Sequence, residues 1–113
     1  MKPVIIVSPL FVKMMSIFIN VHAITLFPFI ISREKMSETT LNHESIHFRQ
    51  QIELFILFFY ILYIFDWIKG LARYRSASEA YYRIRFEQEA YRNEDNKLYL
   101  LTRKRNTWKR YKV

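Results

Sequence analysis

The pentapeptide His43–His47 reads H-E-S-I-H and combines residue types that bind and activate a metal ion. Residues four apart lie on one face of a helix, so both imidazoles can point at the same ion. Glu44 follows the first histidine, and its carboxylate can reach a water molecule bound to that ion. Two histidines, a water molecule and a carboxylate make up most of a zinc hydrolase site. The competing interpretation is a surface helix with two solvated histidines.

A catalytic zinc site usually has three protein ligands, so one more is needed. The chain has no cysteine and no histidine after His47, which leaves a carboxylate. In a helix that begins at Ala77, Glu87 falls on an apolar stripe that should face the first helix, whereas Glu89 falls on a face that looks solvated. Helix phase therefore favours Glu87 and keeps Glu89 as the alternative. The competing interpretation of Glu87 is a surface ion pair with Arg83.

These two motifs together are similar to the metal-binding motifs of a known protein family. His43–His47 on one helix, followed by Glu87-Gln88-Glu89-Ala90 on a later one, resembles the gluzincin class of zinc metallopeptidases, whose third ligand is a glutamate in a pattern E-x-x-A-D. Residues 42–60 and 81–94 are also similar to a group of small bacterial proteins with this two-helix arrangement. H-E-x-x-H is a fairly specific signal, whereas E-x-x-A alone is weak.

The resemblance implies a zinc-dependent peptidase in which Glu44 is the general base. The zinc ligands that it implies are His43, His47 and Glu87. Where the family has an aspartate that orients a zinc-bound histidine, this sequence has Tyr91. Such partners of the ligands support metal affinity and activity, so another side chain has to replace the aspartate. Tyr91 itself and Asn42 are the candidates for this role and for contacts to the transition state.

The chain suits one minimal zincin-like domain, residues 1–113, of the α+β class. Its N-terminal part should form a short antiparallel β element with strands at Val4–Val7 and at residues 23–31. Pro28 removes a ladder donor, which indicates an edge strand, although a core strand with a tolerated proline is the alternative. A substrate peptide could pair with this edge, as in the family that the chain resembles. The strand residues expected to contact it are Thr25, Leu26 and Phe27.

Two long helices should follow and pack antiparallel, because only a short loop joins them. The first is expected from about Thr40 to Ile68, with Gly70 as its stop, and the second from Ala77 to about Leu101. The first helix is polar at its start and then apolar nearly all round. This pattern is typical of a helix that is deeply packed or lies against lipid.

Peripheral membrane contact stays open because residues 54–65 are apolar without interruption, although a membrane span needs about 20 such residues. The formal net charge is +8, and the basic C-terminal tail 97–113 contributes seven cations and no acid. This tail suits anionic lipid or is a solvated end. Nucleic-acid binding is disfavoured, because no recognised nucleic-acid motif accompanies the aromatic residues of the tail.

The N-terminus lacks a convincing signal-peptide cleavage site, so we expect a cytoplasmic or membrane-associated protein. The leading hypothesis is a zinc peptidase that acts on a peptide or protein substrate. The alternative is a non-catalytic interaction protein, either membrane-peripheral or merely metal-binding.

Overall fold

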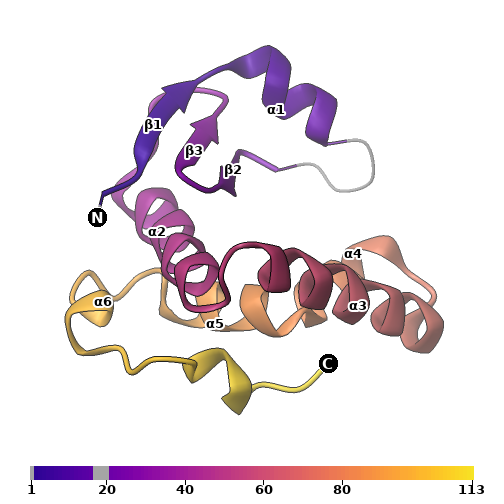
Figure 1. Ribbon diagram of the computed structural model, residues 1–113. Coiled ribbons are helices and arrows are strands. Elements are labelled where there is room, and N and C mark those ends of the chain that lie inside the picture. Colours follow the sequence, from indigo (N-terminus) through magenta and orange to yellow (C-terminus); the bar gives the residue numbers. More distant parts are fainter. Residues whose placement is uncertain (1, 17–20) are drawn as a thin grey trace.

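The computed structural model describes residues 2–16 and 21–113, which form an α+β fold with a small sheet above a layer of helices (Figure 1). The strands are β1 (Val4–Val7), β2 (Ala23–Leu26) and β3 (Phe29–Ser32). The helices are α1 (Pro9–Met15), α2 (Glu38–Glu53), α3 (Leu57–Tyr74), α4 (Ala77–Arg83), α5 (Arg85–Asn93) and α6 (Tyr99–Thr102), followed by a 3-10 turn, η1 (Thr107–Arg110). The predicted α+β class is confirmed.

The predicted short antiparallel β element is confirmed in part, because the sheet is mixed. The strand order is β1-β3-β2, with β1 parallel to β3 and β2 antiparallel to it. The segment 23–31 is not one strand but two, because the chain turns at Phe27 and Pro28. The proline therefore lies in the turn and interrupts no ladder. β2 does lie at an edge of the sheet, whereas β3 is central.

The helix expected over residues 40–68 is wrong as a single helix. The chain bends by 115° between α2 and α3. Ile56 N–H donates to the carbonyl of Gln51 at 2.7 Å and Phe55 N–H donates to that of Ile52 at 3.3 Å, which is the Schellman pair that ends a helix. Phe55 takes the left-handed conformation (φ 52°) that usually belongs to glycine. Because the sequence has no glycine or proline here, no local signal marks this bend.

The helix expected over residues 77–101 is also broken, since Ile84 is extended (φ −56°, ψ 129°) between α4 and α5. The cause is a tertiary contact. Asp66 of α3 accepts from the backbone N–H of Arg85 at 3.2 Å and from its guanidinium at 2.8 Å. A buried carboxylate on one helix thus caps the start of another, and it sets the direction of α5.

Gly70 does not end the first long helix, contrary to prediction. α3 continues to Tyr74, and Arg75 takes the left-handed conformation after it (φ 54°). Gly70 lies where α4 crosses α3, and a Cβ atom there would come within 2.9 Å of the Cα of Ala80. The glycine therefore allows two helices to approach closely.

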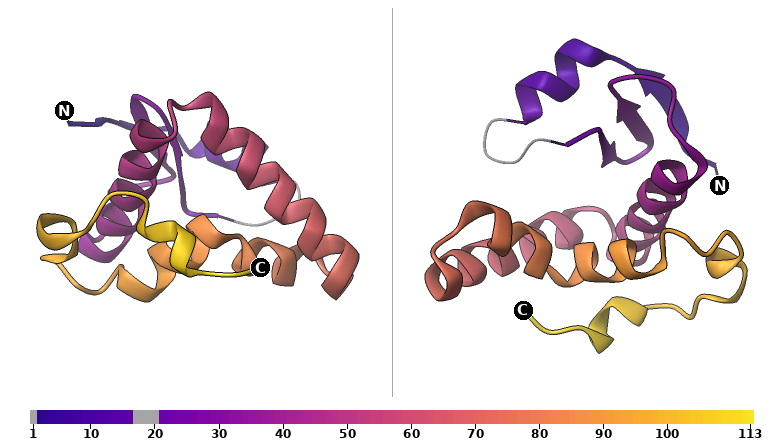
Figure 2. Two further views of the ribbon diagram at one scale, coloured as in Figure 1. Left: turned by 60° about the horizontal axis from the view of Figure 1, so that its bottom comes forward. Right: turned by 180° about the vertical axis from the view of Figure 1, so that it is seen from behind.

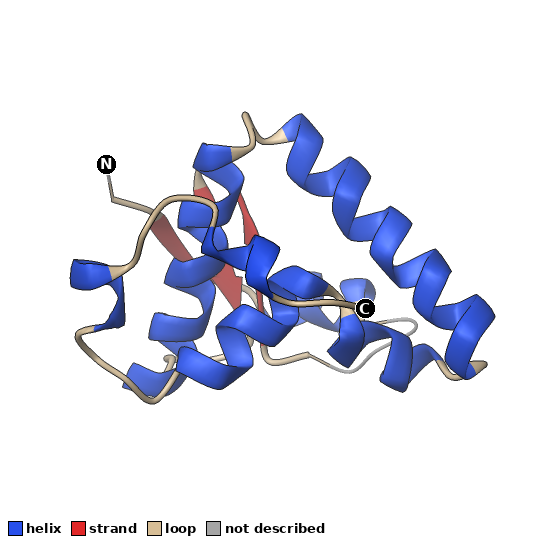
Figure 3. Ribbon diagram, turned by 90° about the horizontal axis from the view of Figure 1, so that it is seen from below, coloured by secondary structure: helices blue, strands red, loops and turns tan. Residues whose placement is uncertain are grey.

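The helices cross one another in the view from below (Figure 3), and their buried side chains form the main apolar core. Its buried members are Phe59, Tyr81, Ile84, Phe86 and Trp108. Trp108 belongs to the C-terminal segment, which folds back along the outside of α5 (Figure 2). The side chain of Arg103 is also buried there and donates to both Glu53 and Glu89. Part of the basic tail is therefore structural.

Phe55→Gly should be better tolerated than Phe58→Gly. Both side chains are more than half exposed, at 75% and 57%, so neither change removes much packing. Glycine relieves a left-handed residue, which costs roughly 1–2 kcal/mol, whereas glycine inside a helix costs about 1 kcal/mol. In urea unfolding, Phe55→Gly should keep a free energy of unfolding about 2–3 kcal/mol above that of Phe58→Gly. Equal decreases in the free energy of unfolding would contradict backbone strain at Phe55.

Candidate metal centre

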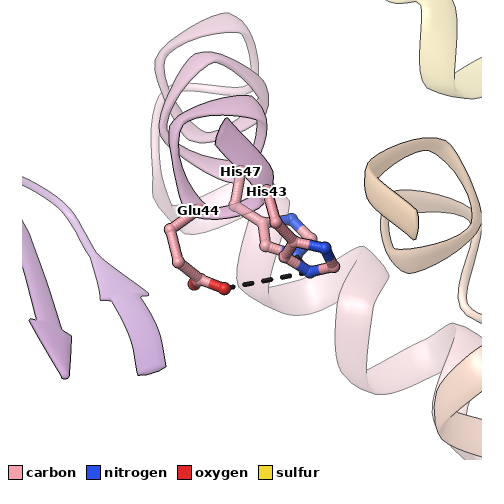
Figure 4. A group of neighbouring side chains, drawn as sticks. All are labelled: His43, Glu44 and His47. Atoms are coloured by element: carbon pink, nitrogen blue, oxygen red, sulfur yellow. Dashed lines mark hydrogen bonds and ion pairs between the residues drawn. The ribbon is translucent and has the colours of Figure 1, made fainter. Parts of the chain in front are cut away.

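His43, Glu44 and His47 project from the same side of α2 (Figure 4). The helix is started by Ser37, whose hydroxyl accepts from the backbone N–H of Thr40 at 3.2 Å. All three side chains are buried, and their nearest ligand atoms lie within 4.8 Å of one another. The spacing of the pentapeptide on a helix thus places three potential ligand groups in one small volume.

Glu87 of α5 completes a triangle of ligand atoms. Its Oε1 lies 3.1 Å from His43 Nε2 and 3.0 Å from His47 Nε2, and the two nitrogens are 3.2 Å apart. Ligands of a tetrahedral zinc ion, each bound at about 2.0–2.1 Å, lie about 3.3 Å from one another. The triangle is therefore close to the size that zinc requires.

Gln50 fixes the orientation of the His47 ring. Its amide nitrogen donates to the carbonyl of Phe86 at 3.2 Å and to Glu89 at 3.0 Å. Its oxygen must then accept, and it lies 2.8 Å from His47 Nδ1. Since Nδ1 carries the proton, the neutral ring presents its lone pair at Nε2, inside the triangle.

Glu94 does the same for His43. Its carboxylate lies 2.9 Å from His43 Nδ1, so that Nδ1 donates and Nε2 turns its lone pair inward. Asn42 supports this contact indirectly, because its side-chain amide donates to the backbone carbonyls of Glu94 and of two neighbours. Glu94 therefore occupies the role expected of the missing aspartate. It follows Glu87 by seven residues, two helical turns, and that spacing could have identified it.

Tyr91 contacts His43 in another way. Its ring packs edge-on against the imidazole, with centroids 4.4 Å apart, and its hydroxyl lies 2.9 Å from that of Tyr81. Tyr81 and Tyr63 both donate to Glu87, at 3.2 Å to Oε1 and 2.5 Å to Oε2. Burial and the charge of Glu87 raise the pKa of Tyr63, so that its phenol stays a donor. The two tyrosines thus fix the orientation of the Glu87 carboxylate, so that Oε1 belongs to the triangle and Oε2 is bound by Tyr63.

Three buried acceptor atoms face one another in this triangle, and such an arrangement needs a positive charge. Protons supply it in the metal-free protein. Burial alone would lower the pKa of His47, but Glu87 and Glu44 outweigh it and raise this pKa to about 9. Burial likewise opposes the charge of Glu87, but the two imidazoles hold its pKa below the usual range. A divalent metal ion would meet the same demand, so the donor set fits such an ion.

The Glu44 carboxylate is hydrogen-bonded to the sheet. The hydroxyl of Thr25 in β2 donates to Glu44 Oε1 at 2.9 Å, and Glu44 Oε2 lies 3.8 Å from His43 Nε2. Burial raises the pKa of Glu44, although the two histidines act in the opposite direction. One carboxylate oxygen is therefore fixed by β2, while the other lies next to the triangle.

Glu89 is not on a solvated face, contrary to the helix-phase expectation. It is fully buried, and Arg103 and Tyr99 donate to it as well as Gln50. The pattern within one helix could not show this, because the C-terminal segment folds over α5. Glu89 therefore stands behind His47 and supports Gln50, outside the triangle.

Two adjoining pockets meet at Glu44. The larger, of about 330 Å³, is mostly apolar and extends along α3, where its walls include Phe59, Tyr60, Tyr63 and Trp67. The smaller, of about 310 Å³, lies beside His43 and is bounded by His22, Tyr82, Tyr91 and Glu94. Val21, Ala23, Glu44 and Tyr81 line both. The candidate metal site thus lies where the two pockets adjoin, and the pair is here called the cleft.

The edge strand β2 borders this cleft, but some backbone groups on its outer side are already hydrogen-bonded. The Gln51 side chain donates to the carbonyl of Thr25 at 2.8 Å and accepts from the N–H of Phe27 at 2.9 Å. Leu26 pairs with Phe29 inside the sheet. Two of the three residues expected to contact substrate, Thr25 and Phe27, therefore already bind Gln51 on that side. Ala23, which lines both pockets, lies where the pockets adjoin.

Comparisons with protein-family models, with curated proteins and with solved structures found no match for this chain. The interpretation of the site therefore depends on its residues and their geometry.

Glu94→Ala should weaken zinc binding by about 10–100-fold, because His43 loses the partner that orients its ring. The neighbouring change Asp95→Ala is the matched control, since Asp95 is an exposed acid that accepts a long, 3.5 Å hydrogen bond from the Thr39 hydroxyl. Competition with a chromophoric chelator measures both affinities, and circular dichroism checks the fold. Equal affinities would show that Glu94 does not orient His43.

Proposed function

We propose that this protein is a zinc-dependent peptidase, with His43, His47 and Glu87 as ligands and Glu44 as the general base. The observation that carries the proposal is the triangle of Nε2, Nε2 and Oε1 atoms with sides of 3.0–3.2 Å, oriented from outside by Gln50 and Glu94. Because the tautomers of both imidazoles are fixed, the buried triangle is preorganised to bind a cation.

The donor set supports zinc among the divalent metals. Two imidazoles and one carboxylate are a ligand set of known zinc peptidases, and a fourth position is left for water or substrate. When bound, such an ion supplies Lewis acidity, which polarises a substrate carbonyl group and makes water more acidic. The chain itself has to supply proton transfer and substrate positioning.

Glu44 is suited to proton transfer. As the oxygen of water bonds to the carbonyl carbon, Oε2 would accept the water proton, because Oε1 is held by Thr25. As the C–N bond breaks, Glu44 would return this proton to the leaving amide nitrogen. Tyr81 lines both pockets, and its hydroxyl would have to turn from Glu87 Oε1 in order to donate to the carbonyl oxygen as negative charge develops there.

The cleft suggests how a peptide would lie. It would run along β2 near Ala23 and across Glu44, with a large apolar side chain in the aromatic pocket of α3. The smaller pocket would receive the polar side of the substrate, next to Glu94.

Glu44→Gln should retain one zinc ion per chain and lose peptide cleavage by at least about 10²-fold, since an amide cannot accept the proton. Glu34→Gln, at an exposed acid outside the cleft, is the control and should cleave as the wild type does. Zinc content by mass spectrometry and cleavage of a mixed peptide library are the measurements. Zinc binding without any cleavage would favour the non-catalytic, metal-binding alternative. A zinc-free wild-type protein would contradict both the peptidase and the metal-binding alternative.

Substrate preference should follow the aromatic pocket. Peptides with Phe or Leu beside the cleaved bond should react faster than the same peptides with Asp. Met15 lines this pocket, whereas Met14 does not, and both are exposed, at 48% and 60%. Met15→Asp should therefore lower kcat/KM for the Phe peptide by about tenfold, while Met14→Asp should leave it unchanged. Equal effects of the two changes would remove the pocket from substrate binding.

A further inference from the structure

The outer side of α3 carries a long apolar stripe. Seven large apolar side chains, on α3 and just before it, are 52–75% exposed. They are Phe55, Leu57, Phe58, Ile61, Ile64, Phe65 and Ile68. Most are spaced by three or four residues, so they form one continuous surface, here called the α3 stripe. A contiguous exposed surface of this kind marks an interaction site.

The exposed charges carried by α3 itself are all positive. Within Leu57–Tyr74, which the structure describes throughout, the one acid is Asp66, and it is buried against Arg85. Lys69 and Arg73 are exposed in the last turns of the helix. Arg73 also donates to the carbonyl of Val113 at 3.0 Å, which brings the basic C-terminal end to the same place. The surface therefore combines an apolar stripe with a cationic end.

This combination distinguishes the occupants that could cover the stripe. A second copy of the chain would bring together two molecules with a formal charge of +8 each. An anionic bilayer attracts these cations and accepts the apolar side chains. Among the described residues, no single helix is long and apolar enough to cross a bilayer, and only the bent pair of α2 and α3 reaches that length together. Lying in the membrane surface is the arrangement that suits the stripe.

We infer that the α3 stripe docks this protein on an anionic lipid bilayer. The apolar side chains enter the boundary between head groups and acyl chains, while Lys69, Arg73 and Lys112 face the lipid phosphates. Docking is a property of the outer side of α3 and goes beyond the proposed hydrolysis. The other side of the same helix forms a wall of the larger pocket, so docking sets the cleft near the membrane surface.

Flotation of the full chain with vesicles tests this inference. Wild-type protein should float with vesicles of phosphatidylcholine and phosphatidylglycerol, and less with phosphatidylcholine alone. The triple variant Ile61→Ser, Phe65→Ser and Ile68→Ser should lose binding by at least about tenfold. Leu101→Ser is the matched control and should bind as the wild type does, since Leu101 is 80% exposed but lies on α6.

A charge-reversal variant tests the cationic end without changing the α3 stripe. Lys69→Glu with Lys112→Glu should lower binding to the anionic vesicles several-fold, whereas Lys35→Glu with Lys104→Glu makes the same charge change elsewhere and should lower it less. Circular dichroism confirms that each variant is folded.

Two outcomes would overturn the inference. They are wild-type protein that stays at the bottom of the gradient with both kinds of vesicle, and a stripe variant that floats as the wild type does. A wild-type dimer that becomes a monomer in the stripe variant, without vesicle binding, would assign the stripe to a second copy. Glu44→Gln should float normally, so this test does not depend on whether the protein is a peptidase.

Discussion

The constraint on which the site depends is that three acceptor atoms face one another in a buried volume. His43 Nε2, His47 Nε2 and Glu87 Oε1 are held 3.0–3.2 Å apart, and in the neutral rings the Nε2 lone pairs point inward. Each would be more stable with a proton or in water, so the surrounding protein has to hold them there. That requirement explains why each imidazole has an acceptor at its outer nitrogen and why two tyrosines hold the carboxylate.

The support extends from the triangle to the surface as a chain of polar groups. His47 is bound by Gln50, Gln50 by Glu89, and Glu89 by Arg103, which also binds Glu53 at the end of α2. Every link is both directional and buried, so a loss at one link leaves its neighbour unpaired. The basic C-terminal segment, which by composition resembles a solvated end, is therefore part of the framework of the site.

Features of this protein that depend on periodicity could be predicted from its sequence, whereas features that depend on tertiary contacts could not. The proximity of His43, Glu44 and His47 follows from helical spacing, and the α+β class follows from the alternation of segments. Glu87 does lie beside the two histidines, although the continuous helix from Ala77 on which its prediction was based is broken at Ile84. The bend at Phe55 did not follow, because a phenylalanine takes the position of a glycine. The break at Ile84 did not follow either, since its cap comes from Asp66 on another helix. The buried state of Glu89 depends on a segment that returns over it from later in the chain.

Asp66 connects the two halves of this architecture. It lies on the inner side of α3, whose outer side carries the apolar stripe, and it caps the first residue of α5, the helix that carries Glu87. Because this carboxylate is buried and bound to both the backbone and the side chain of Arg85, the two helices cannot shift independently without leaving a charge unpaired. The helix that we infer to meet lipid thus also fixes the direction from which Glu87 approaches the two histidines.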